Sequence, residues 1–169
     1  SYASTDGQFG KWPRADKELL AQFHEGIIVF TGCPSGAVQT RLRLGQWDEA
    51  VAEAAQLRDI FGAENFYVEV MDHGIDIERR THRQVLEIAK LMNAPLVATN
   101  DAHYVKRDDR KIQDALLCIN SGSRINDPDR FKFDGDGYYI RSSDEMRSLW
   151  SELPSACDST LEIAERCDV

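Results

Sequence analysis

An aspartate and a histidine two residues apart follow a short apolar segment late in the chain. Residues 96–99 are apolar or β-branched and come directly after Pro95, which ends the preceding helix, so they predict a buried strand. If the chain stays extended beyond this strand, Asp101 and His103 point to the same side. A carboxylate and an imidazole at that spacing suit zinc or manganese. Taken alone, the motif is weak, and the alternative is an aspartate that caps the next turn beside an ordinary loop histidine.

Cys33 follows another apolar segment, residues 27–30, and lies in a tight turn. Gly32 and Gly36 on either side allow the backbone to come close to whatever occupies a site there. The thiol could be a metal ligand or a nucleophile, but no local cysteine-protease signature surrounds it. The simplest interpretation of Cys33 alone is a small buried thiol without chemistry.

Strands and helices are expected to alternate around these residues. Strands are predicted at residues 27–31, 66–71 and 96–100, with helices at residues 37–44, 48–61 and 76–93 between them. This order gives two consecutive βαβ units and therefore a parallel sheet, in which functional residues gather at the carboxyl ends of the strands. Five residues follow strands and are predicted to share that edge: Cys33, Asp72, His73, Asp101 and His103.

The last third of the chain is predicted to be mainly helical. Residues 108–120 form an amphipathic pattern whose apolar side is expected to face inward, with Ile112, Leu116 and Ile119 among its members. Ser142 and Glu145 have the spacing of a capping box that opens a helix through Trp150. A final amphipathic helix is predicted at residues 156–167.

Composition indicates an ordinary soluble globular protein. The chain has 169 residues, of which 42% are hydrophobic and 29% charged, enough for one domain with a core. There is neither a run of about 20 apolar residues nor a basic leader, so neither a membrane span nor a targeting segment is expected. A net charge of −9 argues against a general nucleic-acid surface. Four widely spaced cysteines favour a cytoplasmic protein without a disulfide framework.

Several segments together resemble the α subunit of bacterial DNA polymerase III, most of all its actinobacterial form. They are Thr31-Gly32-Cys33-Pro34-Ser35-Gly36 with Gln39-Thr40-Arg41-Leu42, Ala98-Thr99-Asn100-Asp101-Ala102-His103-Tyr104, and Phe131-Lys132-Phe133 leading to Tyr138-Tyr139. The resemblance runs over the whole chain and falls on the later part of the PHP (polymerase and histidinol phosphatase) domain. It implies an α/β fold in which residues 1–105 form part of a distorted, TIM-like barrel with parallel strands. Residues 106–169 would be its helical end and the connection toward the polymerase core.

The same resemblance implies a metal site. In this family, ligands come from an early His-x-His, further acidic and histidine residues, a mid-domain thiol or imidazole, and a late Asp-x-His. By position, Cys33 matches the mid-domain ligand, and Asp101 and His103 match the late pair. Asp72 and His73 imitate an early Asp-His motif at the wrong place in the order, so they are expected to support the ligands or to be structural. The chain has no His-x-His, so the zinc or manganese site is expected to be incomplete.

The function implied by the resemblance is that of a fragment of a larger enzyme. The complete protein would be a magnesium-dependent, DNA-templated DNA polymerase whose PHP domain is associated with 3′–5′ exonuclease activity. The fragment alone is expected to be inactive, and its partners would be the remainder of the α subunit and, through it, DNA and other replisome subunits. One alternative is a scaffold or partner-docking role with a degenerate metal site. The other is a free-standing PHP phosphoesterase, which the chain length and the Gly32–Gly36 segment disfavour.

Overall fold

A three-stranded parallel sheet lies at the centre of the computed structural model, which describes residues 2–5, 7–9 and 12–167. The strands are β3 (Val29–Phe30), β4 (Phe66–Val70) and β5 (Leu96–Ala98), and β4 pairs in parallel with both of the others. All of β4 is buried, as expected for a central parallel strand covered on both faces. The predicted parallel α/β arrangement is therefore confirmed, with strands slightly shorter than predicted.

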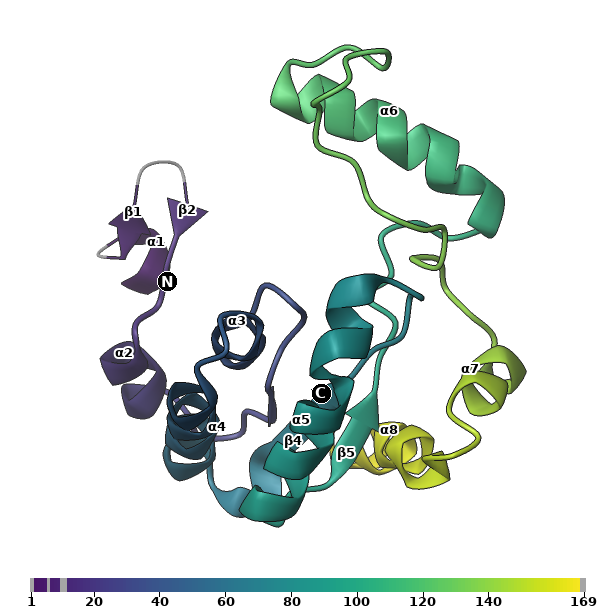
Figure 1. Cartoon of the computed structure of the whole chain (residues 1–169). Coiled ribbons are helices and arrows are strands. Elements are labelled where there is room, and N and C mark those ends of the chain that lie inside the picture. Colours follow the sequence, from purple (N-terminus) through teal and green to yellow (C-terminus); the bar gives the residue numbers. More distant parts are fainter. Residues whose placement is uncertain (1, 6, 10–11, 168–169) are drawn as a thin grey trace.

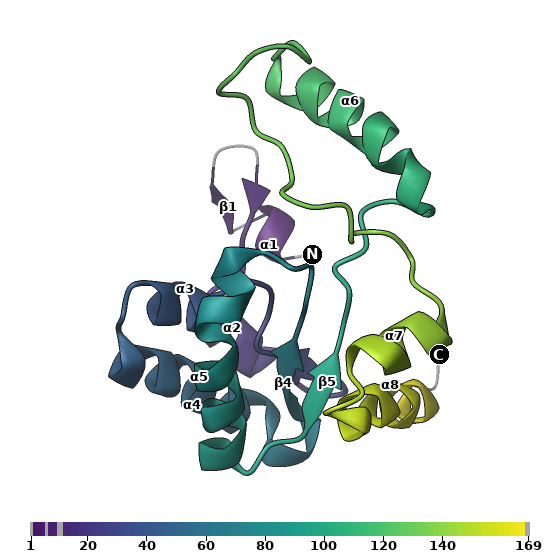
Figure 2. The same cartoon turned by 45° about the vertical axis from the view of Figure 1, so that its right-hand side comes forward.

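Helices cover the two faces of this sheet. The larger helices are α2 (Lys17–Gln22), α3 (Ala37–Arg43), α4 (Trp47–Phe61), α5 (Asp76–Met92), α6 (Arg110–Ser121), α7 (Ser143–Leu149) and α8 (Pro154–Arg166). Figure 2 shows α5 on one side of β4 and β5, and α7 and α8 on the other. The short elements α1 (Tyr2–Thr5), β1 (Gln8–Phe9) and β2 (Trp12–Pro13) lie near the N-terminus, where β1 and β2 pair antiparallel.

Local chemistry explains where the long helices end. Asn93 ends α5 in the left-handed conformation, with φ 49°, which asparagine tolerates better than most residues. Gly62, with φ 86°, ends α4. At the start of α7 the predicted capping box is present: the Ser142 hydroxyl accepts from the Glu145 backbone N–H, and the Glu145 carboxylate accepts from that of Ser142.

One hydrophobic core joins the sheet to helices from the middle and from the C-terminal end of the chain. Val68 of β4 and Ile88 of α5 share this core with Trp150 and Ala156, which lie at the end of α7 and in α8. The segment that contains α7 and α8 therefore packs directly on the sheet.

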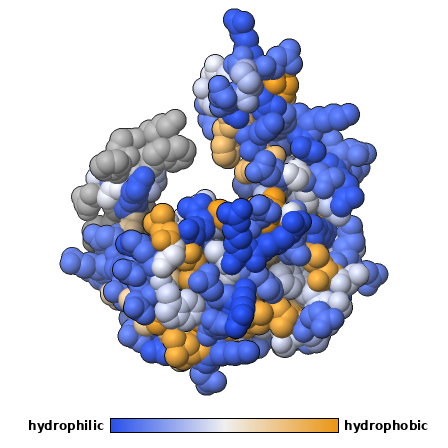
Figure 3. Space-filling model, in the orientation of Figure 1, coloured by the Kyte–Doolittle hydropathy of each residue, from blue (hydrophilic) through white to orange (hydrophobic). Residues whose placement is uncertain are grey.

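Helix α6 differs from its prediction. It stands away from the sheet at the end of two connecting segments, and apolar side chains are visible on the surface of this part of the molecule (Figures 1 and 3). Ile112, Leu116 and Ile119 are 60%, 53% and 77% exposed, and only Cys118 of this helix is buried. The inward orientation expected for these residues is wrong, because periodicity identifies an apolar face but not whether another element covers it. Among the described residues, no helix is both long and apolar enough to cross a membrane.

Candidate metal centre

Asp101 and His103 meet just beyond the carboxyl end of β5. His103 Nε2 lies 3.4 Å from Asp101 Oδ1, and the two side chains are 35% and 37% exposed. The strand ends at Ala98, and Asp101 has φ 40°, in the left-handed region that residues other than glycine seldom adopt. The predicted convergence of the pair is observed, but the extended-chain explanation is wrong, because a turn at Asp101 brings the side chains together.

The geometry of this pair fits two ligands of one metal ion. Oxygen and nitrogen ligands at about 2.0–2.2 Å from a tetrahedral zinc ion are separated by about 3.4 Å. Close by, Asn100 Oδ1 is buried and has no hydrogen-bond partner among the described residues, although the Asn100 amide N–H groups donate to the carbonyls of Gly137 and Tyr139. An unsatisfied oxygen acceptor and a strained aspartate side by side are typical of a functional site rather than of an ordinary loop.

Cys33 lies beyond β3, whose carboxyl end is at the same edge of the sheet as that of β5. Its turn is closed by the Gly36 N–H, which donates to the Cys33 carbonyl at 2.7 Å. A Cβ on Gly36 would lie 3.0 Å from that oxygen, which explains why the turn needs glycine. The thiol is free and half-buried. Within the described part of the chain, no group of three or more His, Cys, Asp or Glu side chains could hold a metal ion, so the structure brings together two of the three predicted ligands.

Glu69 is a polar residue of this region that was not predicted as part of the site. It lies in β4 and is buried, with the Thr99 hydroxyl donating to its Oε1 at 2.6 Å. Burial raises the pKa of Glu69, the hydrogen bonds from Thr99 and from the Gly32 backbone oppose this, and the nearby charge of Asp101 raises it further. Its carboxyl group thus connects the turn after β3 with the end of β5. In the sequence, the sign of this role is that Glu69 is the only charged residue in the strand β4.

His73 is held by hydrogen bonds at both ring nitrogens. Nδ1 lies 2.6 Å from Glu78 Oε1, and Nε2 lies 2.9 Å from the Asn100 carbonyl, which can only accept, so Nε2 carries a proton. The ring is stacked on Tyr138 with the centroids 4.1 Å apart. Burial lowers the pKa of His73, but the hydrogen bonds to Glu78 and Asn100 outweigh it, and the pKa is raised overall.

Of the two neighbours Asp72 and His73, only His73 is linked by a hydrogen bond to the segment that holds Asp101 and His103. His73 connects the start of α5 to the residue that precedes Asp101. Asp72 closes a local turn, since its Oδ1 accepts from the Gly74 N–H at 2.8 Å. In this arrangement neither nitrogen of His73 is free to bind a metal.

The segment around residues 131–139 forms one wall of the centre. The His103 N–H donates to the Tyr138 carbonyl at 2.8 Å, and Tyr104 forms a parallel bridge with Tyr139. The ring of Phe133 lies 4.5 Å from that of His103, measured between centroids. These contacts join residues 30 or more positions apart, so sequence spacing could not reveal them.

Comparison with known proteins gives a match to one domain family and a similarity to one group of bacterial proteins. Residues 1–73 match the family model of the PHP domain. The chain is 58% identical over 167 residues, 98% of its length, to the DNA polymerase III subunit alpha of Mycobacterium tuberculosis. It is 57% identical over 169 residues to that of Saccharopolyspora erythraea and 33% identical over 174 residues to that of Thermus aquaticus.

These matches confirm the resemblance noted from the sequence. Residues 1–73 match the PHP domain, and almost the whole chain is similar to one segment of bacterial DNA polymerase III α subunits. It spans 14% of the length of each of these three curated relatives. The family-model match ends at His73, so it does not test the predicted boundary between residues 105 and 106.

Proposed function

We propose that this chain contributes Asp101, His103 and Cys33 to a divalent-metal site, zinc or manganese, that hydrolyses phosphodiester bonds at DNA 3′ ends. The observation that carries the proposal is the 3.4 Å approach of Asp101 and His103 beyond the end of β5. One chemistry that a bound divalent metal supplies is activation of water by lowering its pKa.

The other residues of the centre have positioning roles in this proposal. His73, held by Glu78, fixes the Asn100 carbonyl and with it the start of the Asp101 turn. Glu69 links the Cys33 turn to β5 through Gly32 and Thr99. Both contacts restrict where the ligand side chains can lie, and a metal site needs that restriction to keep its geometry.

The complete protein is proposed to be a cytoplasmic DNA-directed DNA polymerase that transfers nucleotides with magnesium. Its nucleotidyl-transfer carboxylates would lie outside this chain, so the chain alone is proposed to be inactive. Residues 1–105 would belong to the PHP barrel, and residues 106–169 would lead from it toward the polymerase core. The partners would be the remainder of the α subunit, DNA and other replisome subunits. Similarity to DNA polymerase III α subunits over almost the whole chain supports this context and disfavours a free-standing phosphoesterase.

The test compares Asp101→Asn and His103→Ala in a complete α subunit that carries this segment. Asp101→Asn replaces an anionic ligand with a neutral one, and His103→Ala removes the imidazole. Metal content, measured by plasma mass spectrometry, is expected to fall together with 3′–5′ hydrolysis of labelled single-stranded DNA, by about two orders of magnitude. Polymerase activity is expected to persist.

Matched controls are Asp59→Asn and His24→Ala, which change the same residue types elsewhere on the surface. Unchanged metal content and hydrolysis in the two site variants would contradict the catalytic proposal. A joint loss of polymerization and thermal stability would instead favour the scaffold role. One observation supports the scaffold role: the described residues contain no group of three or more His, Cys, Asp or Glu side chains that could hold a metal ion.

A further inference from the structure

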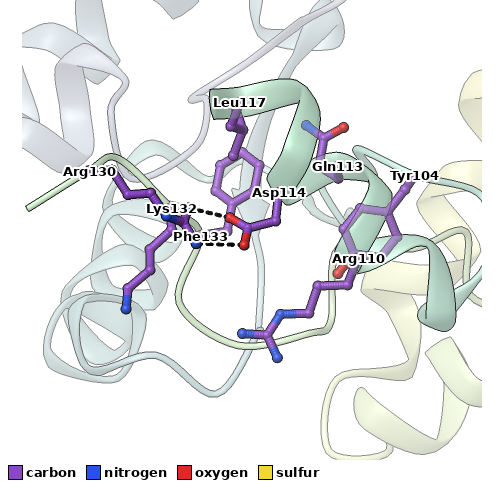
Figure 4. A pocket seen from close by; sticks show the side chains of 8 residues that line it. All are labelled: Tyr104, Arg110, Gln113, Asp114, Leu117, Arg130, Lys132 and Phe133. Carbon is purple, nitrogen blue, oxygen red and sulfur yellow. Dashed lines mark hydrogen bonds and ion pairs between the residues drawn. The ribbon is translucent and has the colours of Figure 1, made fainter. Parts of the chain in front are cut away.

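A small cavity with cationic walls opens beside the candidate metal centre. It has a volume of about 180 Å³ and lies between α6 and the segment around residues 130–133. Its charged wall residues are Arg110, Arg130, Lys132 and Asp114 (Figure 4). The single carboxylate is already engaged: Asp114 is paired through both oxygens with the guanidinium of Arg130, with a 2.6 Å contact from Nη2 to Oδ2. The hydrogen bond from Arg130 lowers the pKa of Asp114, so this carboxyl group stays ionised and paired.

Two cations of the wall make no direct side-chain contact with a charged group. Among the described residues, the side chains of Arg110 and Lys132 form no hydrogen bond or ion pair, and both residues are exposed. Their charges act on Asp114 only at longer range, after the direct contact from Arg130. Figure 4 shows the Lys132 amine pointing away from the Arg130–Asp114 pair, and dashed contacts join only Arg130 and Asp114. The Tyr104 hydroxyl, on another wall, is buried and also lacks a hydrogen-bond partner within the described chain. This cavity is locally positive although the whole chain carries a net charge of −9, so it favours an anion.

Aromatic rings connect this cavity to the candidate metal centre. Phe133 lines the cavity and lies 4.5 Å from the His103 ring between centroids. The ring of Phe131, which is 61% exposed, packs edge-to-face on Phe133 with the centroids 5.6 Å apart. An exposed aromatic face beside unpaired cations is the combination that binds single-stranded nucleic acid, because bases stack on the ring while phosphates contact the cations.

We propose that Arg110, Phe131, Lys132 and Phe133, here called the strand cradle, bind a phosphate and an unstacked base of single-stranded DNA next to Asp101 and His103. This inference rests on the proposed function, since it names how that site would hold its substrate. A single strand fits better than a duplex, because a paired and stacked base offers no free face to Phe131. The cavity volume suits one phosphate group rather than a whole helix groove.

The test measures binding of a fluorescently labelled twelve-residue oligothymidylate to the full 169-residue chain by anisotropy. The buffer contains EDTA, so that binding is measured without any metal. Lys132→Gln and Arg110→Gln are each expected to weaken binding about fivefold at 0.1 M salt and to reduce the slope of log K against log salt by about 0.7. Phe131→Leu is expected to weaken binding at least about fivefold with little change in that slope.

The matched control is Lys90→Gln, an exposed lysine in the last turn of α5 that lies outside the cavity wall. Circular dichroism melts of Lys132→Gln, Arg110→Gln and Lys90→Gln should coincide with that of the unsubstituted chain, because these side chains form no hydrogen bond or ion pair in the described chain. Phe131→Leu removes an edge-to-face contact with Phe133, so its melt is expected slightly lower but still cooperative. Three results would overturn the strand cradle: no binding by the unsubstituted chain, equal weakening by Lys90→Gln, or no preference for the oligonucleotide over inorganic phosphate or duplex.

Asp101→Asn separates this inference from the proposed function. If the strand cradle binds DNA through its own cations and rings, this variant should bind the oligonucleotide as the unsubstituted chain does. Loss of metal binding or hydrolysis in a complete α subunit then bears on the proposed function alone. An oligonucleotide affinity that falls in Asp101→Asn but not in Lys132→Gln would contradict the strand cradle.

Discussion

His73 links three segments of the candidate centre through one buried ring. Its two ring nitrogens contact Glu78 and the Asn100 carbonyl, and its backbone N–H donates to the other oxygen of Glu78 at 2.6 Å. The side chains of His73 and Glu78 are 1% and 6% exposed, so neither charge has water as an alternative partner. Loss of one member would leave the other buried and unpaired, which is far more costly than losing a surface contact.

The first prediction at this scale concerns His73 and pH. Folding raises the pKa of His73 above the unfolded value of about 6.5, so the folded protein binds this proton more tightly than the unfolded chain does. The stabilisation is therefore complete below pH 6.5 and is lost as the pH rises through the higher pKa of the folded state. Urea unfolding of the unsubstituted chain and of His73→Ala should differ by about 3 kcal/mol at pH 6, and by less at pH 9.

The control is His24→Ala, because His24 makes only a local contact with the Ala21 carbonyl. Its effect on the free energy of unfolding should be small. A His73→Ala difference that stays constant from pH 6 to pH 9 would show that folding does not raise the pKa of this histidine.

At the scale of single elements, α6 is the helix whose surroundings differ most from expectation. Its apolar residues follow the period of an amphipathic helix, yet this side is exposed. The helix is anchored instead at its first half, where Asp114 pairs with Arg130 across the connecting segment. Its position relative to the strand cradle therefore depends on an ion pair rather than on a buried apolar face.

This arrangement predicts that Ile119→Lys is nearly neutral for stability. Ile119 is 77% exposed, so its replacement should change the free energy of unfolding by about 0.5 kcal/mol or less. Ile88→Ala in α5 serves as the comparison, because Ile88 is fully buried and its truncation should cost about 2–5 kcal/mol. A loss of more than about 1 kcal/mol in Ile119→Lys, measured by urea unfolding, would mean that another surface covers this face.

At the scale of the whole molecule, the sheet and the C-terminal helices form one packed unit. Trp150 is 5% exposed and belongs to the same core as Val68 and Ile88. The α8 helix also reaches the sheet through the Tyr67 hydroxyl, which contacts both Glu162 and Arg166. Residues on both sides of the proposed boundary at 105/106 therefore depend on one another for burial.

Trp150→Ala is predicted to destabilise the whole unit at once. Truncation of a buried tryptophan should lower the free energy of unfolding by about 3–5 kcal/mol. Trp150→Phe should lower the free energy of unfolding much less, because an aromatic ring still fills the site. The indole Nε1 has no hydrogen-bond partner in the described structure, so the substitution breaks no hydrogen bond. Far-ultraviolet circular dichroism and tyrosine fluorescence should report one shared transition. Two separate transitions would contradict a common core.

Much of the fold and part of the site could be predicted because their causes are local in the chain. The apolar strand β4, the amphipathic helix α5 and the capping box at Ser142 and Glu145 each follow from periodicity or from spacing within one helical turn. Asp101 and His103 could be paired for the same reason, since only one residue separates them.

The sequence by itself determined the parallel α/β order and placed Asp101 and His103 two residues apart, whereas tertiary packing decided the turn that joins them and what surrounds them. Glu69 contacts Thr99, and His73 contacts Glu78 and Asn100, only because parallel strand ends and the start of α5 meet at one edge of the sheet. The left-handed turn at Asp101 and the exposed apolar face of α6 likewise depend on how segments distant in the chain pack against each other. His73 and Glu69 are buried by groups that are distant in the chain, and this burial contributes to their pKa shifts. A local sequence pattern cannot predict which distant groups will pack together.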